Sequence, residues 1–359
     1  MYGAKLNSRL FVRTFLAIAI GLILRLVLAI YTPGNLDQQN FIISAQILRS
    51  GANIYNETPY YNYTPLWGGI LALLSLVNTP LPILVRLTLI AADMANSWLI
   101  SRTISAKAAI IYLLNPVSII LVGYHGQFET LAMLPLLLSA WLIHRGKPAQ
   151  GMIWLLGTLD LIIKHIVLFH VWALFIWIAG TRRAFIWYAG ALIVFVLSFS
   201  PFLPAGIAGI VQHVLLYRST YTFGPMWFLP PPIARGLFVC AMSILPLTLR
   251  ERSLSELLEW ASVLLLVLIP AIGQQYFLLP LLTARRRSIG YWAFTFNATL
   301  FLLASPDGLA VPWLAAVWWP TWLAALFWLI VLFIKRPTSP QYGAMNPALQ
   351  SSIEGLDGQ

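Results

Sequence analysis

The chain has 359 residues, of which 60% are hydrophobic and only 9% are charged. This composition, with apolar runs that recur at about the 20-residue length of a membrane span, excludes an ordinary soluble domain and predicts an all-α, polytopic membrane protein. In a soluble chain, 22 Lys and Arg against 11 Asp and Glu would suggest a nucleic-acid partner. Here the basic residues fall in short clusters between apolar runs, so we interpret them as topology signals and expect membrane lipid, not nucleic acid, as the partner.

The first apolar run extends from Phe15 to Tyr31 and follows a basic flank. It superficially resembles a secretory signal. Arg25 interrupts the run, however, and no small-residue cleavage site follows it, so we expect an uncleaved first membrane helix.

Basic clusters separate the later apolar runs, and assigning all of them to the cytoplasmic side fixes a topology. The clusters are Lys5/Arg9/Arg13, Arg102/Lys107, Arg145/Lys147, Arg182/Arg183, Arg250/Arg252, Arg285/Arg286/Arg287 and Lys335/Arg336. The chain must cross and return between neighbouring clusters, which gives about 11–12 crossings with both termini in the cytoplasm. The predicted crossings are an opening pair over residues 10–31 and 81–104, followed by hairpins over residues 108–144, 148–180, 184–249, 254–284 and 288–334.

Two of these hairpins, residues 148–180 and 254–284, are too short for two full spans of about 20 residues, so we expect short, broken or partly re-entrant arms. Residues 1–334 are interpreted as one transmembrane domain. The final segment, residues 335–359, is rich in Pro, Ser, Gly and Asn and is predicted to be a disordered cytoplasmic tail.

The longest polar interruption is Thr32–Trp67, which lies within the first external loop, residues 32–79. It places Asp37 just outside the first helix. The sequence that follows, QQNFIISAQILRS, has apolar residues at helical spacing and predicts an amphipathic helix on the membrane surface, which would hold Asp37 near the lipid headgroups. Residues 64–77 form an extra apolar element that is not one of the predicted crossings, and we expect them to lie at the outer face.

The predicted topology also turns a common set of polar side chains to the outer face together with Asp37. The set comprises His125, Gln127 and Glu129 in the turn Tyr124–Glu129, the pair Lys164-His165, His213 and Arg218 in the loop Pro204–Pro232, and Gln275 and Tyr276 in the turn Gly273–Phe277. Polar side chains therefore gather on one face of the membrane and basic clusters on the other. Such convergence favours an externally facing site.

The first external loop also carries a family resemblance. Asp37 is followed by Phe41, Ala45, Gly51, Tyr55, Thr58 and the run Tyr61-Asn62-Tyr63-Thr64-Pro65-Leu66. This order resembles the first lumenal loop of the catalytic subunits of glycosylphosphatidylinositol mannosyltransferase I, in which an acidic motif, a G-x-x-x-Y element and an R/N-Y-T-P-L element succeed one another. The resemblance continues through Arg86 to Leu99 with Asp93, Asn115-Pro116, His125 to Glu129, Lys164-His165 and Gln275 to Leu278, and so covers most of the chain.

That family belongs to the C-type glycosyltransferases, multi-spanning enzymes that use sugars linked to polyprenyl or dolichyl phosphate. The resemblance implies the C-type fold and Asp37 as the catalytic acid position. One departure matters for cofactors: the family motif is similar to D-x-D, whereas this chain has Asn35-x-Asp37. A divalent metal bound by paired carboxylates is therefore doubtful here, although Asp37 retains the second acid of the motif, and no other cofactor is indicated.

The chemistry is compatible with a single carboxylate. A glycosidase needs two, because its alcohol leaving group must be protonated. A lipid phosphate leaves as a stabilised anion, so only the acceptor hydroxyl needs a general base, the role predicted for Asp37. Positive charge must receive the phosphate, and Lys164 and His165, then Arg218 and His213, are the candidates. A sugar or acceptor pocket is expected from His125, Gln127, Glu129, Tyr61, Tyr63, Gln275 and Tyr276, although helix-end capping and aromatic belts are bland alternatives for several of these.

The expected function is thus an inverting transfer of a hexose, with mannose as the first expectation, from a polyprenyl-phosphate donor to a lipid-linked or cell-surface glycan on the outer face of a prokaryotic plasma membrane. A flippase for lipid-linked oligosaccharides, or another secondary transporter, is the alternative, and a catalytically inactive scaffold subunit is a third. Transporters favour internal repeats and polar groups at the midplane, whereas here the polar groups gather at one face.

Arg86 and Asp93 lie on one predicted helix, about 10.5 Å apart along its axis, which is too far for a direct pair. An intramembrane carboxylate should have a partner, and Arg25 in the first helix is the predicted one. We interpret this pair as structural.

Overall fold

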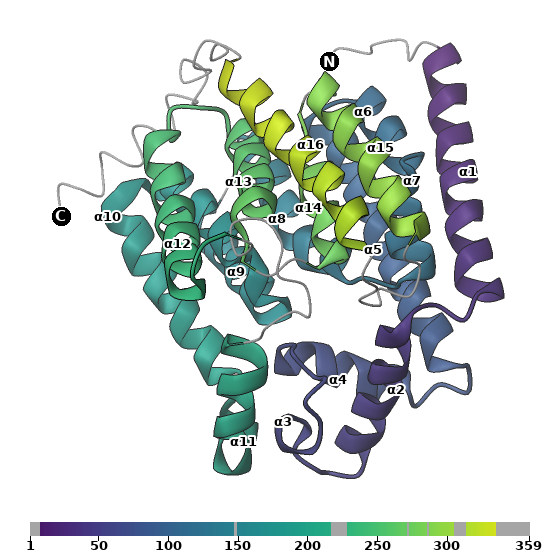
Figure 1. The fold of residues 1–359 in the computed structure, drawn as a ribbon, viewed down its shortest axis with the longest axis vertical. Coiled ribbons are helices and arrows are strands. Elements are labelled where there is room, and N and C mark those ends of the chain that lie inside the picture. Colours follow the sequence, from purple (N-terminus) through teal and green to yellow (C-terminus); the bar gives the residue numbers. More distant parts are fainter. Residues whose placement is uncertain are drawn as a thin grey trace.

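The computed structural model describes residues 8–146, 149–216, 228–270, 273–285, 287–304 and 314–334. Over these ranges the chain is helical, as predicted (Figure 1). The elements are α1 Ser8–Tyr31, α2 Leu36–Arg49, α3 Ile54–Glu57, α4 Pro65–Leu74, α5 Leu81–Thr103, α6 Ala106–Leu113, α7 Pro116–Ile119, η1 Ile120–Tyr124, α8 Glu129–His144, α9 Gln150–Ile163, η2 His165–Val167, α10 Leu168–Leu197, η3 Ser200–Phe202, α11 Leu203–Gly209, η4 Ile210–Leu215, α12 Pro231–Thr248, α13 Leu254–Leu268, η6 Gln274–Phe277, α14 Leu278–Thr283, α15 Ile289–Ala304 and α16 Leu314–Ile334.

Several helices are long and apolar enough to cross a bilayer, which indicates a multi-pass membrane protein. Within the described ranges there are four such segments, in α1, in α5, from residue 165 to 215 and in α12, or up to five if α6 and the helix Pro116–Tyr124, bent by 57°, form one span. Four other apolar helices, α4, α8, α9 and α15, have 10–16 residues, and the apolar part of α16 from Trp318 to Ile334 has 17. Full-length spans are therefore fewer than the predicted crossings, and α9 and α13 are short, as expected from the tight hairpins.

The long helix α10 doubles back on itself at Gly180. This residue has φ 67° and ψ 170°, a conformation that favours glycine. The Tyr188 hydroxyl lies 3.3 Å from the Leu168 carbonyl oxygen, and the rings of Phe175 and Trp187 are 5.5 Å apart. In a straight helix residues 168 and 188 would be about 30 Å apart. The two halves are therefore an antiparallel hairpin, with its turn beside Arg182, where the basic cluster predicts a turn.

Turns that carry basic residues meet at one end of the bundle. The Arg285 guanidinium pairs with Glu256 at 3.0 Å and donates to Ser253 Oγ at 2.9 Å. Arg287 donates to the Ala108 carbonyl at 3.1 Å, which joins the start of α15 to α6. In Figure 1 the turn between α12 and α13 lies at this upper end.

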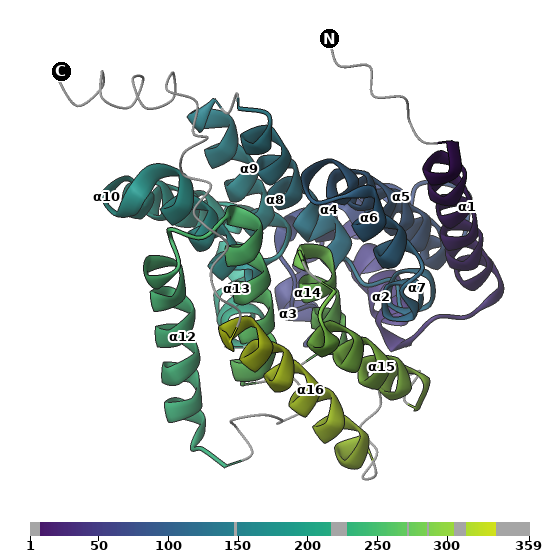
Figure 2. The same ribbon diagram turned by 90° about the horizontal axis from the view of Figure 1, so that it is seen from above.

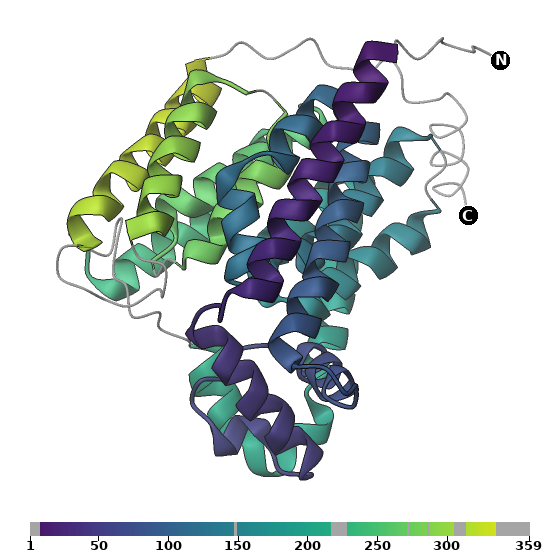
Figure 3. The same ribbon diagram turned by 90° about the vertical axis from the view of Figure 1, so that its right-hand side faces the viewer.

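The opposite end carries a separate lower layer, formed by α2, α3, α4 and α11 (Figures 1 and 3). Asn53 Nδ2 donates to the Phe202 carbonyl at 2.8 Å, and the Tyr55 and Phe202 rings are 5.3 Å apart, so the first loop packs on the segment after α10. Seen from above, α1 and α10 lie on opposite sides of the bundle (Figure 2). The predicted surface helices after Asp37 and at residues 64–77 are α2 and α4 of this layer.

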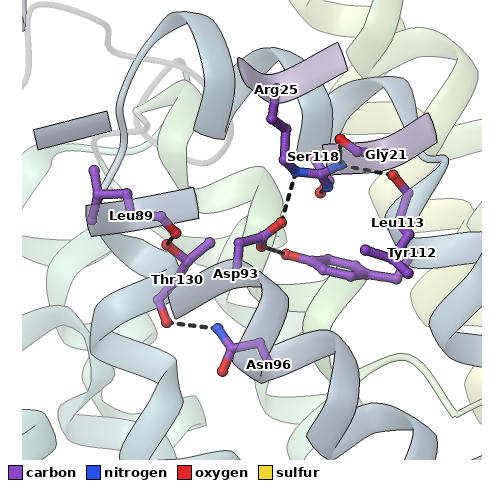
Figure 4. Close-up of polar contacts among 9 residues, drawn as sticks. All are labelled: Gly21, Arg25, Leu89, Asp93, Asn96, Tyr112, Leu113, Ser118 and Thr130. Atoms are coloured by element: carbon purple, nitrogen blue, oxygen red, sulfur yellow. Dashed lines mark hydrogen bonds and ion pairs between the residues drawn. The ribbon is translucent and has the colours of Figure 1, made fainter. Parts of the chain in front are cut away.

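The predicted pairing of Arg25 with Asp93 is confirmed (Figure 4). Arg25 Nε lies 2.8 Å from Asp93 Oδ2, and both side chains are fully buried. Tyr112 donates its hydroxyl hydrogen to Asp93 Oδ1. Arg25 also donates to the carbonyls of Gly21 at 2.9 Å and Leu113 at 2.8 Å, and to the Ser118 hydroxyl. The pair thus joins α1, α5 and the break between α6 and α7.

Candidate active site

Asp37 lies at the start of α2, where the side-chain amides of Asn35 and Gln127 bond to its carboxylate. Asn35 is the helix N-cap: its side-chain oxygen accepts the Asp37 backbone N–H at 3.2 Å, and its Nδ2 donates to Asp37 Oδ2 at 3.0 Å. Gln127 Nε2 donates to the same oxygen at 2.6 Å. Asp37 is half-buried, and its Oδ1 makes no hydrogen bond or ion pair within the described ranges. One carboxylate oxygen is therefore fixed and the other has no partner in the described ranges, at the positive end of a helix dipole.

The turn that delivers Gln127 docks directly on α2. Gln38 Nε2 donates to the His125 carbonyl at 2.8 Å, and both residues are buried. Between them Gly126 has φ 62°, and a Cβ there would lie 2.4 Å from Gln38 Nε2. A side chain at position 126 would be strained by the positive φ and would displace the Gln38 amide, which bonds the turn to α2.

His125 is a neutral imidazole in this turn. Burial lowers its pKa from 6.5 to about 3. Gln274 Nε2 lies 3.3 Å from His125 Nδ1, and because an amide nitrogen can only donate, Nδ1 accepts and Nε2 carries the hydrogen. Nε2 is buried and has no hydrogen-bond partner among the described residues. Gln274, at the start of η6, thus contacts the His125 ring.

Lys164 and Glu129 form a buried ion pair beside Gln127. Lys164 follows the end of α9 in extended conformation, and its Nζ contacts Glu129 Oε1 at the start of α8. The Lys164 side chain is 5% exposed and that of Glu129 is fully buried. Thr64 Oγ1 donates to the Ile163 carbonyl at 2.8 Å, so the first loop is fastened to the chain next to Lys164.

Aromatic rings surround the Lys164 ammonium group. Its Nζ lies 4.2 Å from the ring centroid of Phe128, 5.7 Å from that of Tyr276 and 5.8 Å from that of Tyr63. The Phe128 ring in turn stacks on Trp67 at 4.7 Å. The predicted residues Tyr63 and Tyr276 thus contact Lys164, in an arrangement that suits a cation.

Tyr61 and Arg86 support the site without reaching Asp37. Tyr61 is buried and donates to the Thr64 carbonyl at 2.7 Å, and burial raises the pKa of its phenol well above the usual value. The sequence predicts no partner for Arg86, which lies too far from Asp93 along the helix to pair with it directly. Its guanidinium donates to the Thr32 carbonyl at 3.0 Å and the Leu28 carbonyl at 3.4 Å, which caps the C-terminal end of α1 just before Asp37.

Other predicted residues are not joined to this cluster. His165 follows Lys164, but its Nδ1 is buried with no hydrogen-bond partner in the described part of the chain. His213 lies in η4 and Gln275 in η6, both half-buried, and neither shares a hydrogen bond or ion pair with the described site residues. Arg218 falls outside the described residues.

Asp160 is a buried carboxyl group that the sequence reading overlooked. It lies in α9, four positions before Lys164, and its side chain is fully buried. Neither carboxyl oxygen has a hydrogen-bond partner among the described residues. An acid in the apolar run LLGTLDLII was the available signal, because intramembrane ionisable residues are rare.

The residues around Asp37 do not fit a metal site of the paired-carboxylate kind. Asn35 presents an N–H to Asp37 where a second carboxylate would present an oxygen. Among the described residues no group of three or more His, Cys, Asp or Glu side chains could hold a metal ion. The side chains bonded to one another at Asp37 are one carboxylate and two amides.

The cluster can therefore offer a general base, neutral hydrogen-bonding groups and a cation lined by aromatic rings. These groups come from α2, the turn before α8, the end of α9 and η6, far apart in sequence. No family model matches the chain, and no curated protein matches it.

Proposed function

We propose that this protein is an integral-membrane inverting glycosyltransferase. It transfers a hexose, with mannose as the first candidate, from a polyprenyl-phosphate carrier to a lipid-linked or cell-surface glycan. Asp37 is the general base, and Lys164 receives the leaving phosphate. The reaction takes place on the outer face of a prokaryotic plasma membrane, with both termini in the cytoplasm.

One observation carries the proposal. The turn of residues 127–129 links the half-buried carboxylate of Asp37 to the buried ammonium group of Lys164, where the bundle joins the lower layer. Gln127 bonds to Asp37, and two residues later Glu129 bonds to Lys164. The basic turns meet at the other end of the bundle. This separation suits a site on the non-cytoplasmic side.

The reaction needs few groups from the protein. The acceptor hydroxyl gives its proton to Asp37 Oδ1 while its oxygen attacks the anomeric carbon. The bond from that carbon to the phosphate oxygen breaks, and the polyprenyl phosphate leaves as an anion beside Lys164. Attack opposite the leaving group inverts the anomeric centre. A base contributes about 10²–10⁴ in rate, and placed positive charge stabilises the departing phosphate.

The C-type fold is part of the same proposal. If the bent pair α6 to η1 is one crossing and the two halves of α10 are two, the short helices complete about 11–12 crossings, as the basic clusters predict. The lower layer is then the large first external loop together with α11.

The test is transfer by purified protein from a synthetic polyprenyl-phosphate mannose to a glycolipid acceptor. Asp37→Asn keeps the size of the side chain and its place at the N-terminus of α2, and should lower kcat by about 10² or more without weakening donor binding. Glu57→Gln makes the same carboxylate-to-amide change at an exposed position of α3, in the same layer, and is the matched control. It should leave kcat near the wild-type value. Full activity of Asp37→Asn would eliminate the proposed base.

The same preparation separates the transporter alternative. Movement of a labelled lipid-linked sugar across proteoliposomes without any new glycosidic product would favour a flippase. Product with inverted anomeric configuration supports the transferase.

A further inference from the structure

Glu129 is the anionic partner of Lys164 in the described part of the chain. The other groups around the ammonium nitrogen are the rings of Phe128, Tyr63 and Tyr276. Aromatic faces attract a cation by about 0.5–2 kcal/mol and do not compete with an anion for it. The rings can therefore keep Lys164 in place whichever anion is bonded to it.

Glu129 is held less completely than the structural carboxylate Asp93. Both oxygens of Asp93 are engaged, one by Arg25 and one by Tyr112. In Glu129 only Oε1 is engaged, by Lys164, and Oε2 is buried without a hydrogen-bond partner among the described residues. The negative charge of Asp37 also acts unfavourably on the Glu129 carboxylate. Glu129 therefore has one contact to give up when Lys164 turns to another anion, whereas Asp93 has two.

We propose that Glu129 and the donor's phosphate compete for Lys164: Glu129 holds the ammonium group between turnovers and is exchanged for the phosphate when a polyprenyl-phosphate sugar binds. This inference rests on the proposed function, since it uses the same phosphate site. Glu129 is then a positioning residue that keeps a buried lysine charged and in place. Its return to Lys164 also promotes release of the polyprenyl phosphate after transfer.

The proposal predicts the sign of one substitution. Glu129→Gln removes the competing charge, so a short-chain polyprenyl phosphate should bind about tenfold tighter or better, equivalent to about 1.4 kcal/mol. Lys164→Gln should bind it about tenfold more weakly. Glu259→Gln, another buried glutamate on α13 whose carboxylate accepts the Arg285 backbone N–H, is the matched control and should leave binding unchanged. Polyprenol, which lacks the phosphate, should bind all variants alike.

Binding is measured with purified protein in detergent, by equilibrium titration and by the rise of the thermal unfolding midpoint on adding the lipid. Glu129→Gln leaves Lys164 without an anion and should unfold at a lower temperature on its own. The lipid phosphate should then raise its midpoint more than that of the wild type, so reduced stability does not hide the effect. Glu129→Ala should change the affinity in the same direction.

Unchanged or weaker binding by both Glu129 variants, with Lys164→Gln still weakened, would overturn the exchange and leave Glu129 as a structural partner. If Lys164→Gln binds as tightly as the wild type, the phosphate site of the proposed function fails, and the exchange fails with it. The two failures are therefore distinguishable without any measurement of activity.

Discussion

At the scale of single residues, the candidate site is organised by the turn of residues 125–129, which bonds to α2 through His125 and Gln127 and to Lys164 through Glu129. Asp37, Gln127, Glu129 and Lys164 were all predicted to face the same side, and the structure brings them together. That Lys164 bonds to Glu129 could not be read from the sequence, because a turn does not disclose which way its side chains point. Gln275 was predicted for the pocket, whereas its neighbour Gln274 is the residue beside His125.

His125 gives a pH-dependent prediction at this scale. Its folded pKa of about 3 lies below the ordinary 6.5. Between these values the unfolded chain binds a proton that the folded protein excludes, so the free energy of unfolding falls as the pH is lowered from 6.5. Each pH unit is worth about 1.4 kcal/mol.

The thermal unfolding midpoint should therefore drop more between pH 8 and pH 5 in the wild type than in His125→Gln, by the equivalent of about 2 kcal/mol. Other buried histidines are present in both proteins and cancel in this comparison. Equal drops in the two proteins would show that His125 titrates normally in the fold.

At the scale of elements, apolar length and basic clusters predict where the chain turns but not how each arm is built. The turn near Arg182 was predicted, and it is made by Gly180, whose positive φ reverses the chain inside one continuous apolar stretch. Hydropathy alone cannot distinguish such a hairpin from one long helix. The break between α6 and the following helix is easier to predict from the sequence, because Asn115-Pro116 ends one helix and begins the next.

The joint between α1 and α5 depends on Arg25 and Asp93. Removing one partner leaves a buried charge unpaired, so Asp93→Leu alone should destabilise the fold by about 3–5 kcal/mol. Arg25→Met combined with Asp93→Leu should recover much of that loss, because a fully apolar pair carries no uncompensated charge. Thermal unfolding in detergent of both single variants and the double variant measures the coupling.

Asp93→Lys, which opposes Arg25 with a like charge, should fail to fold. A stable Asp93→Lys protein would contradict the role of the Arg25–Asp93 pair in joining α1 to α5.

At the scale of the whole molecule, the chain is asymmetric along the bundle axis. The basic turns meet at one end through Arg285 and Arg287, while α2, α3, α4 and α11 form the lower layer, with the candidate site, at the other. The order of basic clusters predicts this polarity from sequence, because it needs only the positions of charges relative to apolar runs. The packing of α11 on the first loop was not predictable, since it depends on contacts between segments about 150 residues apart, such as Asn53 and Phe202.

This polarity predicts an orientation of the protein in the cell membrane, with the lower layer outside. In a background with Cys240→Ala, a cysteine at Tyr60, which is 65% exposed in the lower layer, should react with a membrane-impermeant maleimide added to intact cells. A cysteine at Arg145, exposed at the end of α8 among the basic turns, should react only after the membrane is opened. Because Asp37 shares the lower end with Tyr60, labelling of Tyr60→Cys from outside would put the proposed base on the side where a lipid-linked acceptor is extended. The opposite pattern would invert the topology, place the cluster in the cytoplasm and remove the reason for a lipid-borne donor.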